Sequence, residues 1–329
     1  MPEVFRNDAT SSPSGAWNLH PYTLSKSACD LLRWHFEAIV RLLRANLVSR
    51  VNVPTSCPME KLEQYERQLR SDGFCLVEEV VPAGACDRIR DRLIKVAQRC
   101  RLAKPAAKHI SFVPGVINED QSFAPYLADQ RVLTLAERLL GPNFRVSFTS
   151  ALINEPGKQR TNWHADWPFN QDNACHVPAP YPDRVMHLTA LIMLSPFTEA
   201  NGGTLLVPGS HRASSNPTDP GLGIDPTLPY PTEYRVTGRA GSLLLFDSRL
   251  WHCPPANPSA APRVALGFRY APWWLNLEAL DPDSDQRQQL VTEPGLTDNI
   301  VPRVDPNVWQ SLPENVQPLL RHWVGRNEG

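Results

Sequence analysis

The sequence predicts a mainly β protein, an antiparallel sandwich or jelly roll with helices packed against it. Up to about residue 140, apolar residues recur with the three-to-four-residue spacing of helices, and afterwards they alternate with a period of two. Pairs of Gly, Pro and Asn separate the later segments, as turns do. The 33 prolines among 329 residues also favour short strands and loops over a helical bundle.

The composition excludes several classes of function. With 33 basic and 34 acidic residues the net charge is −1, which provides no electrostatic footprint for nucleic acid. No stretch approaches the ~18–20 uncharged apolar residues of a membrane span, and the N-terminus lacks the apolar core of a secretory signal. Seven scattered cysteines without a C-x-x-C pair are typical of a reduced intracellular protein. We therefore expect a cytoplasmic protein, with its oligomeric state open.

Residues 1–58 are predicted to form an arm and one amphipathic helix. The first 24 residues are polar and rich in Ser and Pro, which is typical of a loose segment. We expect the helix to pack on the main body, and the alternative is a helix lying on a membrane surface. Its apolar stripe consists of Leu32, Phe36, Ile39, Leu43 and Leu47.

The next segment, up to about residue 140, is predicted to be largely helical. One helix begins near Met59 and stops at Gly73, which suits a left-handed C-terminal cap. A strand follows over Phe74–Val81. Two more helices carry the apolar stripes Cys86–Cys100 and Val132–Leu139, and a Gly-Pro pair ends the second of them.

Period-two segments predict the strands of the jelly roll, and the turn signals between them fit an antiparallel arrangement. Beyond about residue 275 the chain is rich in Asp, Pro and Gln, so we expect loops and one short helix near Pro313–Val324 that pack on the same domain. The chain thus divides into an arm (1–58), a central domain (59–275) and a C-terminal extension (276–329). The predicted strands are Phe144–Thr149, Asn162–Trp167, His187–Leu194, Thr204–Val207, Ser242–Phe246 and Arg263–Tyr270.

His164 and Asp166 are the first candidate metal ligands. Alternate residues of a strand share one face, so both side chains can point at one spot. Two histidines and one carboxylate form the facial triad of non-haem Fe(II) sites, and this pair supplies two of the three. A strand-edge histidine paired with a carboxylate is the structural alternative.

Four later histidines are candidates for the third ligand. His176 lies in a Pro-rich loop, His187 begins an apolar strand where a packed core residue is expected, and His211 follows a turn where a surface or turn residue is expected. His252 directly follows the apolar segment SLLLFDSRLW, 88 residues after His164. A jelly roll can place two such distant segments side by side, so His252 is the preferred third ligand.

Arg263 lies 11 residues after His252 and opens the next strand. Arg263, Ala265 and Gly267 share one face of this strand, so the guanidinium lies beside two very small side chains. Such a face suits a pocket floor, where a guanidinium can bind a carboxylate through two parallel hydrogen bonds. A structural salt bridge is the alternative.

These residues and three flanking motifs resemble the Fe(II)/2-oxoglutarate-dependent oxygenases, in particular the phytanoyl-CoA dioxygenase family. The similarity includes the order of H-x-D, distal histidine and arginine, and it extends from Lys61 to about Trp273. The flanking motifs are a helix followed by Asp72-Gly73-Phe74, the LLGPN turn at Leu139–Asn143 and NGGTLLVPGSHR at Asn201–Arg212.

The resemblance implies a double-stranded β-helix that uses Fe(II), O2 and 2-oxoglutarate to oxidise a small organic substrate, with succinate as the co-product. Arg263 would anchor the distal carboxylate of 2-oxoglutarate, and Thr204 and Thr161 resemble co-substrate-binding positions of relatives. The implied iron ligands are His164, Asp166 and His252. Aromatic residues near these ligands are candidates for lining the substrate pocket, namely Trp167, Phe169 and Trp251.

Two other functions stay open on the sequence alone. A non-catalytic jelly-roll binding protein would carry the same residues as a vestigial metal site, and a cupin-type metal enzyme would not use 2-oxoglutarate. Asp166 argues against the related halogenases, which carry a small residue at that position. The sequence names neither the substrate nor the outcome of its oxidation, whether hydroxylation, desaturation, ring closure or epimerisation.

Overall fold

The computed structural model describes residues 59–103, 112–167, 180–278, 280–296 and 302–325. The chain divides into two compact units, Met1–Ser56 and Cys57–Gly329, and all described residues belong to the second. The predicted helix over Leu32–Leu47, the candidate ligand His176 and the candidate pocket residue Phe169 lie outside the described residues.

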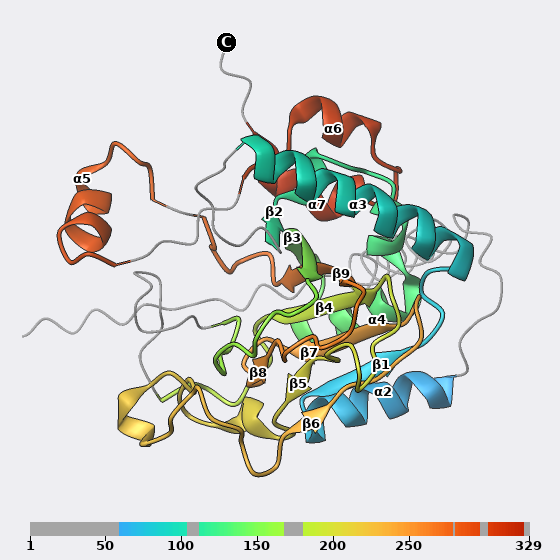
Figure 1. The fold of residues 1–329 in the computed structure, drawn as a ribbon. Coiled ribbons are helices and arrows are strands. Elements are labelled where there is room, and N and C mark those ends of the chain that lie inside the picture. Colours follow the sequence, from blue (N-terminus) through green and yellow to red (C-terminus); the bar gives the residue numbers. More distant parts are fainter. Residues whose placement is uncertain (1–58, 104–111, 168–179, 279, 297–301, 326–329) are drawn as a thin grey trace, which may run out of the picture. The chain divides into compact units, whose positions relative to one another are not determined.

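Two antiparallel sheets form the described core (Figure 1). The larger has the strand order β1-β7-β4-β9-β3-β2, and the smaller has the order β6-β5-β8. Leu206 of the smaller sheet shares one buried cluster with Leu244 and Phe246 of the larger, so the two sheets face each other. The predicted jelly roll, a double-stranded β-helix, is confirmed. The strands are β1 (Phe74–Val77), β2 (Phe112–Pro114), β3 (Arg145–Asn154), β4 (Leu188–Met193), β5 (Leu205–Leu206), β6 (Tyr234–Arg235), β7 (Leu243–Asp247), β8 (His252–Cys253) and β9 (Arg263–Ala271).

The larger sheet has two differently used faces. On β4, Ala190 and Ile192 join the main core cluster beneath the helices, whereas Leu191 belongs to the cluster shared with the smaller sheet. On β9, Val264 and Ala265 divide in the same way. Because side chains alternate across a strand, every second residue of β4 and β9 is directed into the space between the sheets.

Apart from the short helix at Asp285–Arg287, the helices pack on the outer face of the larger sheet (Figure 1). The helix predicted to begin near Met59 buries Leu62, Tyr65 and Leu69. The Asp129 side chain accepts hydrogen bonds from two backbone N–H groups and so caps the predicted helix that carries the Val132–Leu139 stripe. The helices are α2 (Met59–Ser71), α3 (Ala83–Ala103), α4 (Gln130–Leu140), α5 (Asp285–Arg287), α6 (Pro306–Ser311) and α7 (Gln317–Leu320). Short 3-10 turns cover Val116–Asn118, Ala124–Ala128, Ser210–Arg212, Pro220–Leu222 and Arg321–Trp323, and a π-turn covers Gln288–Thr292.

The C-terminal extension contributes to the main core cluster. Leu320 and Trp323 are buried in it, and the Asn118 side chain donates to Arg303 O at 2.7 Å and accepts from the N–H of Asp305 at 2.9 Å. The short helix predicted near the C-terminus is divided into α7 and a 3-10 turn. α6 was not predicted, although its Asp-Pro start is a recognised helix signal.

The predicted strand Asn162–Trp167 is wrong. Within the described residues of this segment, His164 alone pairs as a strand residue, in an isolated antiparallel bridge with His252. The N–H of Asp166 instead donates to Ser248 O. Because the backbone bonds of this segment go to different parts of the chain, no single partner strand continues the ladder.

β1 is also shorter than predicted. It ends at Val77 rather than Val81, because Glu79 adopts a left-handed conformation with φ of 55°. The N–H groups of Val80 and Val81 then both donate to Gly241 O, which turns the chain toward α3.

Candidate metal centre

His164 and His252 face each other across a short antiparallel pair. The N–H of each donates to the carbonyl of the other, at 3.0 and 2.9 Å, and their ring centres lie 4.2 Å apart. Each Nδ1 is bonded to a backbone carbonyl two residues earlier, Asn162 O at 3.1 Å and Leu250 O at 2.9 Å. A carbonyl can only accept, so each Nδ1 carries the proton and each Nε2 presents its lone pair to a metal.

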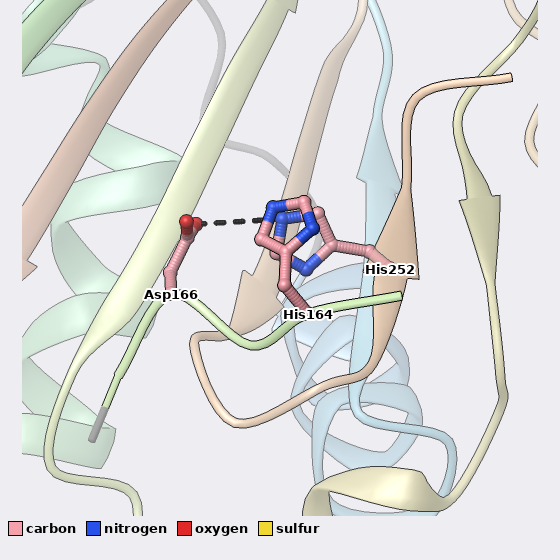
Figure 2. A group of neighbouring side chains, drawn as sticks. All are labelled: His164, Asp166 and His252. Carbon is pink, nitrogen blue, oxygen red and sulfur yellow. Dashed lines mark ion pairs between the residues drawn. The ribbon is translucent and has the colours of Figure 1, made fainter. Parts of the chain in front are cut away.

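Asp166 completes the donor set. The candidate ligand atoms of the three residues lie within 4.8 Å of one another, and Asp166 Oδ2 is 3.7 Å from His252 Nε2 (Figure 2). Arg269 Nη2 donates to Oδ1 at 2.5 Å, and Thr189 Oγ1 donates to Oδ2 at 2.8 Å. Two imidazole nitrogens and one carboxylate oxygen around one point match the donors of a 2-His-1-carboxylate metal site. The structure therefore brings together the three residues that the sequence singled out.

The charge states suit a divalent cation. Burial by itself would raise the pKa of Asp166, but the Arg269 guanidinium, together with the two histidines and Thr189, holds that pKa well below its usual range. Burial and the neighbouring His164 lower the pKa of His252 to about 4. At neutral pH the cluster thus offers a carboxylate and a neutral imidazole, the forms that bind metals.

We expect the metal-free protein to lose stability as the pH falls from about 6.5 to about 4. Burial lowers the pKa of His252 to about 4 and that of His187 to about 3 from the ordinary 6.5. In this window the unfolded chain binds protons that the native state excludes, so acid favours unfolding, by up to about 1.4 kcal/mol per pH unit for each histidine. Urea midpoints between pH 7 and 4.5 measure the slope, and His187→Gln should reduce it. A midpoint independent of pH would contradict the expectation.

Arg263 lines the same cavity as the three candidate ligands and is 5% exposed. Its Nη1 lies 3.5 Å from Thr204 Oγ1, and its guanidinium lies 4.3 Å from the centre of the Phe197 ring. Its Nε is buried without a hydrogen-bond partner, and no carboxylate among the described residues forms an ion pair with it. Burial lowers its pKa to about 10, so it stays a cation at neutral pH. A buried cation of this kind calls for an anionic ligand, and the salt-bridge alternative finds no partner.

The cavity measures about 380 Å³, and its floor is the inner face of the larger sheet. Gly267 of β9 pairs with Ser150 of β3, and a Cβ on Gly267 would lie 2.6 Å from Leu152 Cδ1. A side chain at that point would therefore require Leu152 and Ser150 to shift. The strand face predicted to carry Arg263, Ala265 and Gly267 also carries the next alternate residue, Arg269. Arg269 lines the cavity and donates a hydrogen bond to Asp166. Extending the alternation by one step would have found Arg269 from the sequence.

The remaining predicted site residues fall into two groups. Thr204 lines the cavity, whereas Thr161 does not, and Thr161 Oγ1 donates to Pro254 O at 3.4 Å. Trp167 and Trp251 are buried outside the cavity lining, and Trp251 packs in a separate apolar cluster. The aromatic residues that line the described cavity are Phe112, Phe148, Phe246 and Phe268.

His211 lies in a turn, which is one of the two positions expected for it, but it is buried and has a structural role. It is 3% exposed. Its Nε2 contacts Arg70 O at 3.3 Å, and Arg212 Nη2 donates to the same carbonyl at 2.9 Å, so both hold the end of α2. A Cβ on Gly73 would lie 2.5 Å from His211 Nδ1. Two of the motifs noted in the sequence therefore pack against each other and support the fold.

A jelly roll gathers two histidines, an aspartate and an arginine with no described counter-ion around one cavity. This arrangement defines the class of the molecule as a candidate metal-dependent enzyme. Residues 69–265 match the family model described as phytanoyl-CoA dioxygenase (PhyH). The chain belongs to the phytanoyl-CoA dioxygenase family. In the part of the chain that the structure describes, no helix combines the length and the apolar character needed to cross a membrane.

Individual relatives are distant. An uncharacterized protein of Mycobacterium tuberculosis is 26% identical over 223 residues, covering 64% of this chain and 75% of its own. The dioxygenase af480 of Aspergillus fumigatus is 29% identical over 220 residues, covering 64% and 66%, and the ectoine dioxygenase of Streptomyces coelicolor is 27% identical over 229 residues, covering 59% and 72%. Among solved structures, HygX from Streptomyces hygroscopicus with nickel and 2-oxoglutarate bound has a TM-score of 0.52 at 18% identity, covering 70% of this chain and 94% of its own. That likeness shows the fold alone.

Proposed function

We propose that this protein is an Fe(II)- and 2-oxoglutarate-dependent oxygenase that oxidises a C–H bond of a small organic substrate. The observation that carries the proposal is the pairing, in one cavity, of a His-Asp-His donor set with a buried arginine that has no anionic partner among the described residues. The first matches the ligands of non-haem iron, and the second matches the free carboxylate of a 2-oxo acid. The family and the dioxygenases among its relatives support the same class of activity.

Each residue has a defined role in this proposal. Nε2 of His164, Nε2 of His252 and Oδ2 of Asp166 would hold the metal. Arg263, with Thr204 beside it, would bind the distal carboxylate of 2-oxoglutarate and so orient its 2-oxo acid end toward the metal. When bound, iron with 2-oxoglutarate and O2 supplies the oxidant, and the co-substrate leaves as succinate and CO2.

The aromatic end of the described lining favours an apolar substrate group, whereas Lys158 lines the cavity elsewhere together with Arg263. Phe112 stacks on Phe148 with ring centres 5.9 Å apart, and Phe112 is 46% exposed at the edge of the larger sheet. Arg269 lies 4.6 Å from the centre of the Phe148 ring but its guanidinium is engaged with Asp166. The positive charge of Arg263 is assigned to the co-substrate, so the aromatic end offers ring faces rather than charges to the substrate.

Uncoupled turnover tests the proposed function. The iron-loaded enzyme should form succinate from 2-oxoglutarate under O2, and His252→Ala should not. Among candidates supplied at equal concentration, neutral aromatic or alicyclic compounds should stimulate succinate formation more than carboxylates or amino acids. Absence of any succinate would favour the non-catalytic binding protein, and oxidation of a substrate without 2-oxoglutarate would favour the cupin-type enzyme. Stimulation by charged compounds alone would contradict the assigned substrate class.

A further inference from the structure

A chain of buried hydrogen bonds runs from His187 to Asp166. His187 Nδ1 lies 2.8 Å from Ser248 Oγ, Ser248 Oγ lies 2.7 Å from Thr189 Oγ1, and Thr189 Oγ1 lies 2.8 Å from Asp166 Oδ2. At its far end, His187 Nε2 lies 3.1 Å from Ser147 Oγ. The three central residues are at most 3% exposed. They come from the residue before β4, from β4 itself and from the turn after β7, so this series of hydrogen bonds joins separate segments of the protein.

The direction of every donor in this chain follows from its end at Asp166. An ionised carboxylate only accepts, so the single hydroxyl proton of Thr189 is committed to Asp166. Ser248 must then donate to Thr189, and His187 Nδ1 must donate to Ser248. The neutral ring then presents the lone pair of Nε2 to the Ser147 hydroxyl, whose single proton faces both that nitrogen at 3.1 Å and Arg269 O at 3.4 Å. Burial, with Arg269 nearby, lowers the pKa of His187 to about 3, in agreement with a neutral ring.

The same residues also hold the backbone of Asp166. Ser248 O accepts from the N–H groups of Asp166 and Trp167 at 2.9 and 3.2 Å, and the N–H of Ser248 donates to His187 O at 3.0 Å. The backbone N–H of Asp166 and its carboxylate are thus both held by the group formed by His187, Ser248 and Thr189.

The bonds on the carboxylate leave one well-defined place for a metal. Arg269 occupies Oδ1, and Thr189 occupies one side of Oδ2. The other side of Oδ2 faces His252 Nε2, 3.7 Å away. We propose that His187, Ser248 and Thr189 are positioning residues that fix Asp166 as a one-oxygen metal ligand through Oδ2. This inference goes beyond the proposed function and rests on it, since it requires a metal at the three ligands.

Anaerobic Co(II) titration, followed by the visible absorption of the bound ion, tests the inference without turnover. Thr189→Val keeps the shape of the side chain and removes the hydroxyl, so it should weaken Co(II) binding by roughly 10- to 100-fold, the usual effect of losing a partner behind a metal ligand. Thr189→Ser should restore most of the affinity. In the Thr189→Val background, Ser248→Ala should have little further effect, because the chain is already interrupted.

Thr149→Val is the matched control. Thr149 is fully buried on β3 next to Ser150, so it points away from the cavity, and its Oγ1 accepts from the N–H of Ile117 at 3.4 Å. The control should lose stability as Thr189→Val does, without losing affinity for Co(II). Equal Co(II) affinity in Thr189→Val and wild type would overturn the inference while leaving the proposed function intact. Equal Co(II) affinity in His252→Ala and wild type would overturn both the inference and the proposed function.

Long-range ¹H–¹⁵N correlation of the imidazoles provides a second, metal-free readout. His187, identified by the signal lost in His187→Gln, should carry its proton on Nδ1 in the wild type. In Thr189→Val the direction of the chain is no longer imposed, so the Nε2–H form should gain population. A wild-type His187 protonated on Nε2 would overturn the inference, because the donors would then not run toward Asp166.

Discussion

Arg263→Met is expected to abolish 2-oxoglutarate binding and, in the same protein, to raise the stability of the ligand-free state. The guanidinium is 5% exposed, its Nε lacks a partner, and it has no counter-ion among the described residues. Removing a buried charge of this kind relieves its desolvation, which exceeds the about 0.5–2 kcal/mol lost with the cation–π contact to Phe197. We expect a net gain of about 1 kcal/mol or more.

The loss of binding has a separate cause. Two charge-assisted hydrogen bonds to a carboxylate contribute about 3 kcal/mol or more, so the dissociation constant of 2-oxoglutarate should rise by over roughly 100-fold. Arg263→Lys should also bind poorly, because a single ammonium cannot reproduce the planar two-bond contact. Calorimetry on Co(II)-loaded protein measures the affinity, and metal binding itself should not change.

Arg249→Met is the matched control for stability. Arg249 is equally buried, at 4% exposure, but its Nη2 lies 3.1 Å from the buried carboxylate of Asp247. Its removal leaves that carboxylate unpaired and should destabilise the protein by about 3–5 kcal/mol. Thermal unfolding without ligand should therefore shift upward for Arg263→Met and downward for Arg249→Met. A downward shift in both would show that Arg263 is a structural residue.

Asp166→Asn is expected to lose the metal and to lose stability. The substitution keeps the shape of the side chain but removes the negative charge, so the affinity for a divalent metal should fall by at least about 100-fold. It also leaves the largely buried Arg269 guanidinium, whose Nη2 lies 2.5 Å from Oδ1, without its counter-ion. Breaking such a pair by removing one partner costs about 3–5 kcal/mol.

His164→Ala separates the two effects. His164 is half-buried and its ring is hydrogen-bonded to Asn162 O, so His164→Ala leaves the Arg269–Asp166 pair intact and should lose the metal at little cost to the metal-free protein. Metal analysis and urea unfolding of both variants give the comparison. Stoichiometric metal in both would refute the assigned ligands, and an unchanged urea midpoint in Asp166→Asn would refute the stabilising role of the Arg269–Asp166 pair.

The sequence by itself determined the local elements and the identity of the candidate ligands. Helix α2 and strand β9 follow directly from apolar periodicity, because burial of one face selects residues three to four apart in a helix and two apart in a strand. Spacing along the chain also identified the candidate site residues. These are the H-x-D pair, the distal histidine and the arginine 11 residues after it. For Asn162–Trp167 the alternating pattern predicted a strand, but whether the segment pairs as a strand depends on its tertiary partners, and there the prediction failed.

The tertiary structure alone decided which groups meet and which stay unpaired. Arg269 and Asp166 lie 103 residues apart, and their contact depends on the register of β9 against β3 and β4. The aromatic lining came from Phe112 and Phe148 rather than from the tryptophans beside the ligands in sequence. That Arg263 has no counter-ion among the described residues is likewise a property of the packed interior. It can be stated only when the position of every described neighbour is known. Such pairings arise from contacts between distant segments, and local residue patterns do not encode them.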